Sequence, residues 1–196
     1  MDALVVIAHP CADSYTHACA AAAIAGLTAA GHTVDLIDLY AEGFTAAMSL
    51  DERLAYETDE PILDPMIADH AGRLLRAKAV VFVYPTWWSG LPAILKGWLE
   101  RVMVPGVGFT FDSRTGKVKP GLTHVRRIVG ISTYGSPRRY VVLVNDNGRR
   151  IITRALRMSC GIRARTTWLG LYAIDTADAE ARQHHLDRVE SRLTAL

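Results

Sequence analysis

The sequence predicts an α/β fold built on a parallel sheet, and three observations lead to this prediction. The chain has 196 residues, of which 50% are hydrophobic and 21% are charged, so it holds enough apolar material for a packed core. Short apolar runs of the kind that form buried strands recur along the chain. Segments with a helical spacing of apolar residues separate these runs. This alternation produces parallel strands joined by right-handed crossovers, with helices on both faces of the sheet.

Five segments are predicted to form strands. Four are continuous apolar runs, which is the pattern of a strand buried on both faces. They are residues 3–8, 79–84, 128–131 and 166–172. The fifth, residues 33–39, alternates polar and apolar side chains, as an edge strand with one exposed face does.

Five further segments are predicted to form helices. Residues 16–30 are rich in alanine and end before Gly31, a suitable C-terminal cap. Residues 91–103 place Pro92 where a first helical turn tolerates proline, and their apolar side chains share one face. The remaining three are residues 64–78, 145–160 and 178–196.

This order of elements fits a flavodoxin-like, doubly wound sheet of five parallel strands in the order 2-1-3-4-5. The length predicts a single domain over residues 1–196. Residues 41–65 form the longest irregular stretch, and loops of that length are usually functional.

Composition argues against several classes of protein. A formal charge of +2 gives little ground for a nucleic-acid partner, and the longest apolar stretch, residues 18–27, is too short to span a membrane. The N-terminus lacks a positively charged leader, and the three cysteines form no CxxC pair that would suggest a zinc site. His184 and His185 are adjacent on a predicted helix, so they diverge, cannot share a metal and are expected at the surface. We therefore expect a soluble, cytoplasmic protein without a metal.

Ligands in such sheets bind beyond the carboxyl ends of the strands, near the point where the strand order reverses. Three loops occupy that position, residues 9–16, 85–90 and 132–140. The first places hydroxyls and backbone amides at the start of a helix, where unpaired N–H groups and the helix dipole favour an anion. It lacks the glycine patterns of dinucleotide and P-loop sites. Two interpretations of this loop remain: it binds a phosphate, or Ser14 or Thr16 only caps the helix. His9 either packs against the protein or contacts a ligand.

The second loop contains two adjacent tryptophans, Trp87 and Trp88. Both can hardly point into the core, so one must face a cleft or a partner subunit. An indole in a cleft is suited to stacking against a flat aromatic ligand. The alternatives are a plug for the loop or a contact in a dimer.

Three segments of the chain together resemble one known family. Residues 84–102, YPTWWSGLPAILKGWLERV, closely resemble the signature segment of the NAD(P)H:quinone oxidoreductases. This family of flavodoxin-like flavoproteins includes DT-diaphorase, the modulator of drug activity B and ancillary oxidoreductases of potassium-efflux systems. Ala8-His9-Pro10 followed by Ser14 resembles its first flavin-phosphate loop, and residues 131–135 resemble its third flavin loop. The resemblance extends over residues 3–140.

The resemblance implies a flavin, either FMN or FAD, that is held by three loops. The residues that would hold its phosphate are His9, Ser14, Tyr15 and Thr16. Those along the edge of the isoalloxazine ring are Pro85, Thr86, Trp87 and Trp88. Those that would close the other side of the ring are Ser132, Thr133, Tyr134 and Gly135.

The resemblance also implies the reaction. NADH or NADPH would pass a hydride to flavin N5 and leave, and a quinone or similar flat acceptor would then take two electrons in the same place, by a ping-pong mechanism. In the family a tyrosine and a histidine near the third loop assist this transfer. Tyr140 stands at the tyrosine's position, but Asp146 occupies the histidine's. The residues that could supply this assistance in place of the histidine are Tyr140, Tyr134 and Arg138, and the two tyrosines are the expected catalytic residues.

Other functions fit parts of the sequence. A flavodoxin-type electron carrier is disfavoured, because such carriers are acidic around the flavin and this chain is mildly basic. A flavin-binding regulatory subunit of a potassium-efflux system, with a peripheral membrane partner, and an FMN-dependent azoreductase or chromate reductase remain as alternatives. The resemblance also implies a homodimer, with the helix 91–104 and the loop 104–109 as the expected contact.

Overall fold

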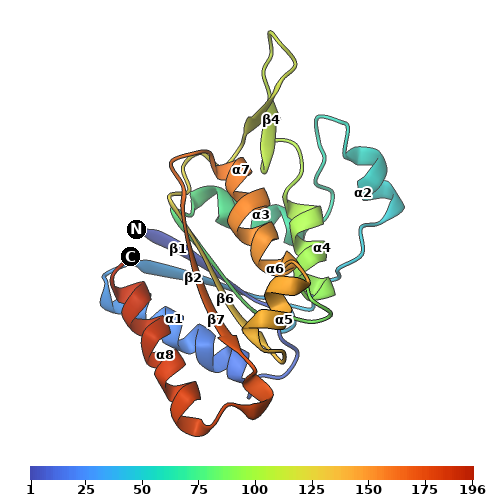
Figure 1. Cartoon of the computed structure of the whole chain (residues 1–196). Helices are drawn as coiled ribbons and strands as arrows, with labels where there is room; N and C mark the ends of the chain where they lie inside the picture. The colour runs from blue at the N-terminus through green and yellow to red at the C-terminus, as the bar shows by residue number, and fades with distance from the viewer.

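A computed structural model describes residues 1–196, and it confirms the predicted parallel sheet. The strands run in the order β2 (Thr33–Asp38), β1 (Asp2–Ile7), β3 (Ala79–Pro85), β6 (Arg127–Tyr134) and β7 (Arg165–Tyr172) (Figure 1). Counted along the chain within this sheet, this is the predicted order 2-1-3-4-5. β2 forms one edge, as its alternating pattern predicted. The run 166–172 is not buried on both faces as predicted, because β7 forms the other edge and only Leu169 in it is buried.

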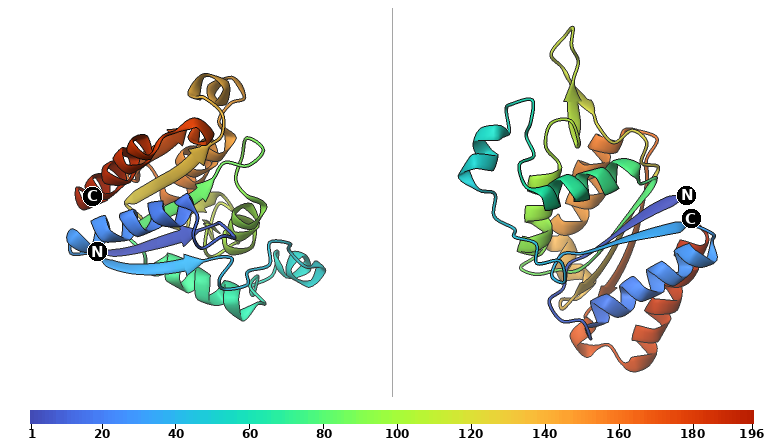
Figure 2. Two further views of the ribbon diagram at one scale, coloured as in Figure 1. Left: turned by 90° about the horizontal axis from the view of Figure 1, so that it is seen from below. Right: turned by 180° about the vertical axis from the view of Figure 1, so that it is seen from behind.

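Helices cover both faces of this sheet (Figures 1 and 2). On one face, α1 (Tyr15–Ala29) packs against α8 (Ala179–Thr194). On the other lie α3 (Pro65–Arg76), α4 (Ala93–Val102) and α7 (Leu156–Cys160). The predicted helix 145–160 is present as α6 (Asn147–Arg150), a π-helical segment (Ile151–Ala155) and α7.

Several short elements were not predicted. They are α2 (Leu50–Ala55), α5 (Arg138–Leu143), a 3₁₀ turn (Ile174–Thr176) and an antiparallel hairpin of β4 (Phe109–Phe111) and β5 (Val118–Pro120). The hairpin and α2 project away from the sheet at the top of Figure 1. None of the helices combines the length and the apolar character that a membrane crossing requires.

The boundaries of the helices follow their capping residues. Ser14 accepts a hydrogen bond from the amide of His17 at the start of α1, and Gly31 beyond its end has a φ of +76°. Asp64 caps α3 by accepting from the amide of Met66. Pro92 lies just before α4 and not in its first turn, so the helix begins later than predicted.

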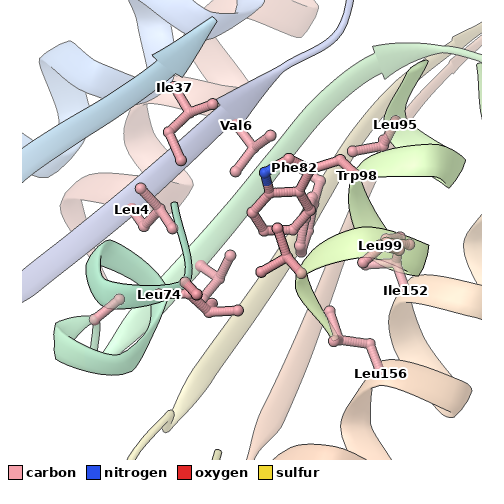
Figure 3. Packing of buried hydrophobic residues seen from close by; sticks show 14 of the residues in the cluster. Leu4, Val6, Ile37, Leu74, Phe82, Leu95, Trp98, Leu99, Ile152 and Leu156 are labelled. Carbon is pink, nitrogen blue, oxygen red and sulfur yellow. The ribbon is translucent and has the colours of Figure 1, made fainter. Parts of the chain in front are cut away.

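Two apolar cores flank the sheet. The larger contains 27 buried residues, and at its centre the ring of Phe82 from β3 meets that of Trp98 from α4 at a centroid distance of 6.0 Å. Figure 3 shows these two rings surrounded by aliphatic side chains from the sheet and the helices. The smaller core contains 15 buried residues and lies under α1 and α8.

This packing shows what covers the apolar face of α4. Leu95, Trp98 and Val102 are buried on the sheet, and Val104 and Val107 of the following loop are buried as well. These apolar side chains belong to the chain's own core, so a dimer contact through α4 and this loop stays a prediction that would use their outer face. Periodicity predicted an apolar face correctly but does not show what covers it.

Arg101 of α4 anchors the stretch 41–65 to the body of the protein. Its guanidinium donates to Glu52 Oε1 from Nε at 2.8 Å and from Nη2 at 2.6 Å, and to Asp64 Oδ2 at 2.8 Å. It also donates to the carbonyl of Thr45. The three acceptors lie along residues 41–65, so one buried cation fixes the path of that stretch.

The surface position expected for the histidine pair is wrong for one of its members. His184 is exposed, but His185 is buried between α8 and α1. Its Nδ1 lies 3.3 Å from the hydroxyl of Tyr15 and 3.9 Å from Sγ of Cys19. Burial, together with the nearby charge of Arg188, lowers the pKa of His185 to about 4.

We expect His185 to make the protein less stable in acid. A histidine in an unfolded chain has a pKa of about 6.5, so the unfolded state takes up a proton at a higher pH than the folded state. The stabilisation is full above about pH 6.5 and is lost as the pH falls toward about 4, by at most about 3 kcal/mol in total. Urea unfolding between pH 7 and pH 4 measures this loss.

The variant His185→Gln should lose less stability over this range than the wild type. The matched variant His184→Gln removes the exposed neighbour and should behave like the wild type. Equal losses in the wild type and in His185→Gln would contradict this origin of the acid sensitivity.

Candidate functional site

The loops that follow β1, β3 and β6 meet at the end of the sheet where the carboxyl ends of the parallel strands lie. The ring of His9, after β1, lies 5.9 Å from that of Trp87, after β3, measured between centroids. The amide of Thr86 donates to the carbonyl of Thr133 at 2.8 Å, and the hydroxyls of Thr86 and Ser132 are 2.9 Å apart. The strand order reverses between β1 and β3, which is where ligands bind in sheets of this type. The structure thus brings together the three segments that the sequence singled out.

The first loop offers free donors at the start of α1. The hydrogen bonds of this helix begin with the amide of Ala18, so the amides of Tyr15 and Thr16 have no backbone acceptor. The side chain of His9 lies in the same loop and accepts from the amide of Cys11 at 3.0 Å through Nδ1. The same Nδ1 lies 3.2 Å from the carbonyl oxygen of Cys11, so the backbone of Cys11 holds the imidazole ring in place.

Two of the four residues expected at the phosphate do not direct their side chains there. The hydroxyl of Tyr15 points to α8, where it donates to the carbonyl of Arg182 at 2.8 Å. Thr16 is buried, with 4% of its surface exposed. A role for these two residues would therefore rest on their backbone amides, whereas His9 and Ser14 offer side chains.

The second loop displays its tryptophans to solvent. Trp87 is 42% exposed and Trp88 is fully exposed, so neither indole is part of the core. Trp88 and Ser89 have φ values of +47° and +59°, a left-handed conformation that is uncommon outside glycine and clusters at functional sites. The amides of Trp88 and Ser89 make no hydrogen bond within the chain. The loop thus presents both an aromatic face and unpaired donors.

The third segment differs from the prediction. Ser132, Thr133 and Tyr134 were expected in a loop, but β6 continues through Tyr134 and all three are buried. Ser132 and Thr133 each form a hydrogen bond with Thr86, as described above, so they hold the start of the second loop in place. Only Gly135 of the predicted set lies in the loop itself.

A pocket of about 270 Å³ lies between the second loop, the end of β6 and α5. Its lining residues are Thr86, Trp88, Ser89, Tyr134, Gly135, Ser136, Tyr140, Val141, Val144 and Asp146. The two tyrosines predicted as catalytic, Tyr134 and Tyr140, both line it. Pro85 and Trp87 lie outside this lining, although Trp87 joins the pocket to the first loop through its contact with His9.

The polar floor of the pocket is formed by Asp146 and Tyr134. The hydroxyl of Tyr134 donates to Asp146 Oδ1 at 3.0 Å, and the carboxylate is only 11% exposed. The hydroxyl of the neighbouring Tyr84 is buried and has no hydrogen-bond partner. Burial first, and then the charge of Asp146, raise the pKa of both tyrosines well above the usual range. Both hydroxyls therefore keep their protons at physiological pH.

Sequence reasoning missed a polar group beside the first loop. Nδ1 of His17 lies 3.0 Å from Oγ of Ser14, and its Nε2 lies 3.0 Å from Oδ2 of Asp38. Asp38 is the last residue of β2 and pairs with Ile7, the residue at the carboxyl end of β1. A polar residue at this end of a strand could have been predicted to lie near the first loop. His17 was treated as an ordinary residue of a helix, and the contact joins residues 21 positions apart.

Comparison with known proteins identifies the family. Residues 1–193 match the family model described as a flavodoxin-like fold. NAD(P)H dehydrogenase (quinone) 1 of Rattus norvegicus is 30% identical over 97% of this chain and 76% of its own length. This chain belongs to the NAD(P)H:quinone oxidoreductase family. The resemblance found in the sequence is thereby confirmed, and it covers nearly the whole chain.

Solved structures that are similar to this chain share its fold. An NAD(P)H:quinone oxidoreductase from Methanothermobacter marburgensis is 25% identical, with a TM-score of 0.81 over 99% of this chain and 98% of that chain. An FMN-dependent NADH-azoreductase from Bacillus anthracis, solved in complex with FMN, is 18% identical, with a TM-score of 0.74 over 100% and 99% of the two chains. At 18% identity, the similarity to the azoreductase shows only that the two proteins share a fold. This chain spans about half the length of several other curated relatives, between 49% and 55%.

Proposed function

We propose that the protein is a flavin-dependent NAD(P)H:quinone oxidoreductase. The observation that carries this proposal is the pocket between the second and third loops, which an exposed indole, unpaired backbone amides and tyrosine hydroxyls line. The first loop adjoins it through the contact of His9 with Trp87. A flat heterocycle with a polar edge and a phosphate tail has the matching chemistry, because its ring packs on aromatic faces and its phosphate suits a helix N-terminus. The names of the rat and Methanothermobacter relatives support the same reaction.

The donors on this surface fit a flavin. The free amides of Trp88 and Ser89 would donate to the polar edge of the ring. The free amides at the start of α1, together with the side chains of His9 and Ser14, would hold the phosphate. Because His9 touches Trp87, the two parts of this surface adjoin. FMN and FAD both carry this ring and this phosphate.

When bound, the flavin supplies the chemistry that passes two electrons from a nicotinamide to an acceptor. The chain's own residues orient the reactants. Trp88 and Tyr140, which is 49% exposed, provide aromatic walls for a flat molecule. A single cleft of this kind takes the nicotinamide and the quinone in turn, which predicts ping-pong kinetics.

The two tyrosines of the pocket would have different roles. The hydroxyl of Tyr140 makes no hydrogen bond within the chain and is free to donate to a bound molecule. The hydroxyl of Tyr134 already gives its only proton to Asp146. Tyr140 is therefore the tyrosine that would touch the reactants, and Tyr134 would act by positioning the carboxylate of Asp146.

The purified protein should carry or take up a flavin that NADH or NADPH bleaches without oxygen. Adding a benzoquinone should then restore the colour. An absorbance spectrum follows both steps, and the mass of the released cofactor separates FMN from FAD. Steady-state rates measured over both substrates should give parallel double-reciprocal lines.

Three results would contradict the proposal, each in a different way. A protein that stays colourless after incubation with FMN and with FAD would not be a flavoprotein. A bound flavin that neither nicotinamide reduces would favour the regulatory subunit of a potassium-efflux system. A kcat/KM that is higher for an azo dye than for every quinone tested would favour an azoreductase.

A further inference from the structure

Ser14, His17 and Asp38 form a hydrogen-bonded chain at the proposed phosphate site, and the function proposed above uses Ser14 but gives no role to His17 or Asp38. Oγ of Ser14 caps α1 by accepting from the amide of His17 at 3.3 Å, and it also lies 3.0 Å from Nδ1 of the same residue. Nε2 of His17 then lies 3.0 Å from Oδ2 of Asp38. The side chains of His17 and Asp38 are each 20% exposed, so the chain is shielded but reachable from solvent.

Asp38 is held in place as an acceptor. Its Oδ1 accepts from the amides of Tyr40 at 3.1 Å and Ala41 at 3.2 Å, which leaves Oδ2 for His17. An ionised carboxylate can only accept hydrogen bonds, so Nε2 of His17 carries a proton and donates it to Asp38. The state of the other ring nitrogen, Nδ1, then decides the direction of the bond to Ser14.

The two protonation states of His17 orient the Ser14 hydroxyl in opposite ways. In the neutral ring Nδ1 is an acceptor, so Ser14 gives its only hydroxyl proton to His17 and has none for a ligand. In the charged ring Nδ1 donates to Oγ of Ser14, and the hydroxyl proton is free to point to an anion. The charged ring also brings a positive charge beside the anion and remains paired with Asp38.

We propose that binding of the phosphate group of a flavin is coupled to the uptake of a proton from solvent at Nδ1 of His17. The inference rests on the proposed function, since it assumes that the first loop holds that phosphate. No electron moves in this step, and the only new covalent bond is N–H. The phosphate binds the charged form of the site more tightly than the neutral form, so binding draws the proton in.

The groups that surround His17 support this assignment. From β2 comes the carboxylate of Asp38, and from the loop after β1 comes the ring of His9, 6.3 Å away between centroids. The loop after β3 contributes the uncharged indole of Trp87, which covers His9. Histidine is the side chain whose charge ordinarily changes between about pH 5 and pH 8, so it is the residue type suited to take up a proton beside a bound anion.

Calorimetric titration of the flavin-free protein with FAD, FMN and riboflavin tests the coupling. Each titration is run at pH 7.5 in two phosphate-free buffers with different heats of ionisation, which gives the number of protons taken up. The wild type should take up as much as about one proton for each FAD or FMN bound. Its affinity for these two flavins should rise by as much as about tenfold when the pH falls by one unit. Riboflavin lacks the phosphate and should cause no uptake that depends on His17.

Variants assign the uptake to this residue. His17→Gln should lose most of the uptake with FAD and FMN, and Asp38→Asn should also reduce it, because the charged ring loses its partner. His184→Gln removes an exposed histidine from α8 and should leave the uptake unchanged. Circular dichroism confirms that each variant is folded before it is compared.

The outcomes separate the two proposals. If the wild type binds FAD or FMN and both His17→Gln and Asp38→Asn take up as many protons as the wild type, the coupling is wrong and the proposed function stands. A riboflavin uptake as large as that of FMN, lost in His17→Gln, would also overturn the link to phosphate. If the wild type binds none of the three flavins, the proposed function fails and this inference fails with it.

Discussion

Replacing Tyr134 with phenylalanine should lower kcat/KM for quinone reduction by about 10- to 100-fold. The change removes the hydroxyl that donates to Asp146 at 3.0 Å and leaves the ring of the tyrosine in place. A hydrogen bond to a charged group contributes about 1.5–3 kcal/mol, and each 1.4 kcal/mol corresponds to about a factor of ten in rate. Without that bond the carboxylate loses its fixed position on the pocket floor. Steady-state kinetics of the flavin-loaded variant measure the effect.

Tyr172→Phe is the matched control for this variant. The ring of Tyr172 stacks on that of Tyr134 at 4.5 Å, with only 14° between the ring planes, but Tyr172 does not line the pocket. The control should keep kcat/KM within about threefold of the wild type, the scale of a loss under 1 kcal/mol. A Tyr134→Phe enzyme as active as the control would show that the Tyr134–Asp146 bond has no role in turnover.

Replacing Arg101 with alanine should lower the free energy of unfolding by about 3 kcal/mol or more. The guanidinium is buried, with 7% of the residue exposed, and it holds the carboxylates of Glu52 and Asp64. Removing Arg101 leaves the carboxylate of Glu52, whose side chain is 11% exposed, without its partner, and breaking a buried ion pair in this way costs about 3–5 kcal/mol. Arg101 also packs over the ring of Phe44, 5.3 Å from its centroid, so packing is lost as well. Urea unfolding at pH 7 measures the change.

Arg53→Ala is the control for the loss of an exposed arginine. Arg53 pairs with Glu57 at 3.4 Å, and the side chains of both residues are more than half exposed. Such pairs contribute about 0.5 kcal/mol or less, so this variant should unfold almost as the wild type does. A loss below about 1 kcal/mol for Arg101→Ala would mean that apolar contacts, and not the ion pairs, hold the stretch 41–65.

The sheet could be predicted because its strands leave a local signal. The runs that became β1 and β3 are continuously apolar, and burial on both faces produces that pattern. The end of β6 was missed because the apolar run stops at Ile131, although Thr133 and Tyr134 are residue types that favour strands. The hydrogen bonds of Ser132 and Thr133 go to Thr86, 46 positions away in the case of Ser132, and no local pattern shows such a partner. The hairpin around Asp112–Gly116 was a readable turn between aromatic and β-branched residues.

The candidate site was predictable at the level of loops and less so at the level of side chains. The order of the strands alone placed the loops after β1, β3 and β6 together. The direction of each side chain at the site depends on the helix or strand that carries it, and not on the loop alone. Tyr15 turns its hydroxyl to α8, whereas His17, two residues later, reaches Asp38. That difference arises from the direction of side chains around α1, which composition and motifs do not contain.

The parallel sheet has a consequence for how the protein is made. Each of its pairings joins distant segments, such as Leu4 with Val80 between β1 and β3, and Phe82 with Gly130 between β3 and β6. Contacts between segments so far apart form slowly, because a long loop must close before any of them is gained. The lining of the pocket extends along the chain to Asp146. A growing chain on the ribosome therefore has no complete pocket until that residue has emerged, and a flavin can be captured only late in synthesis.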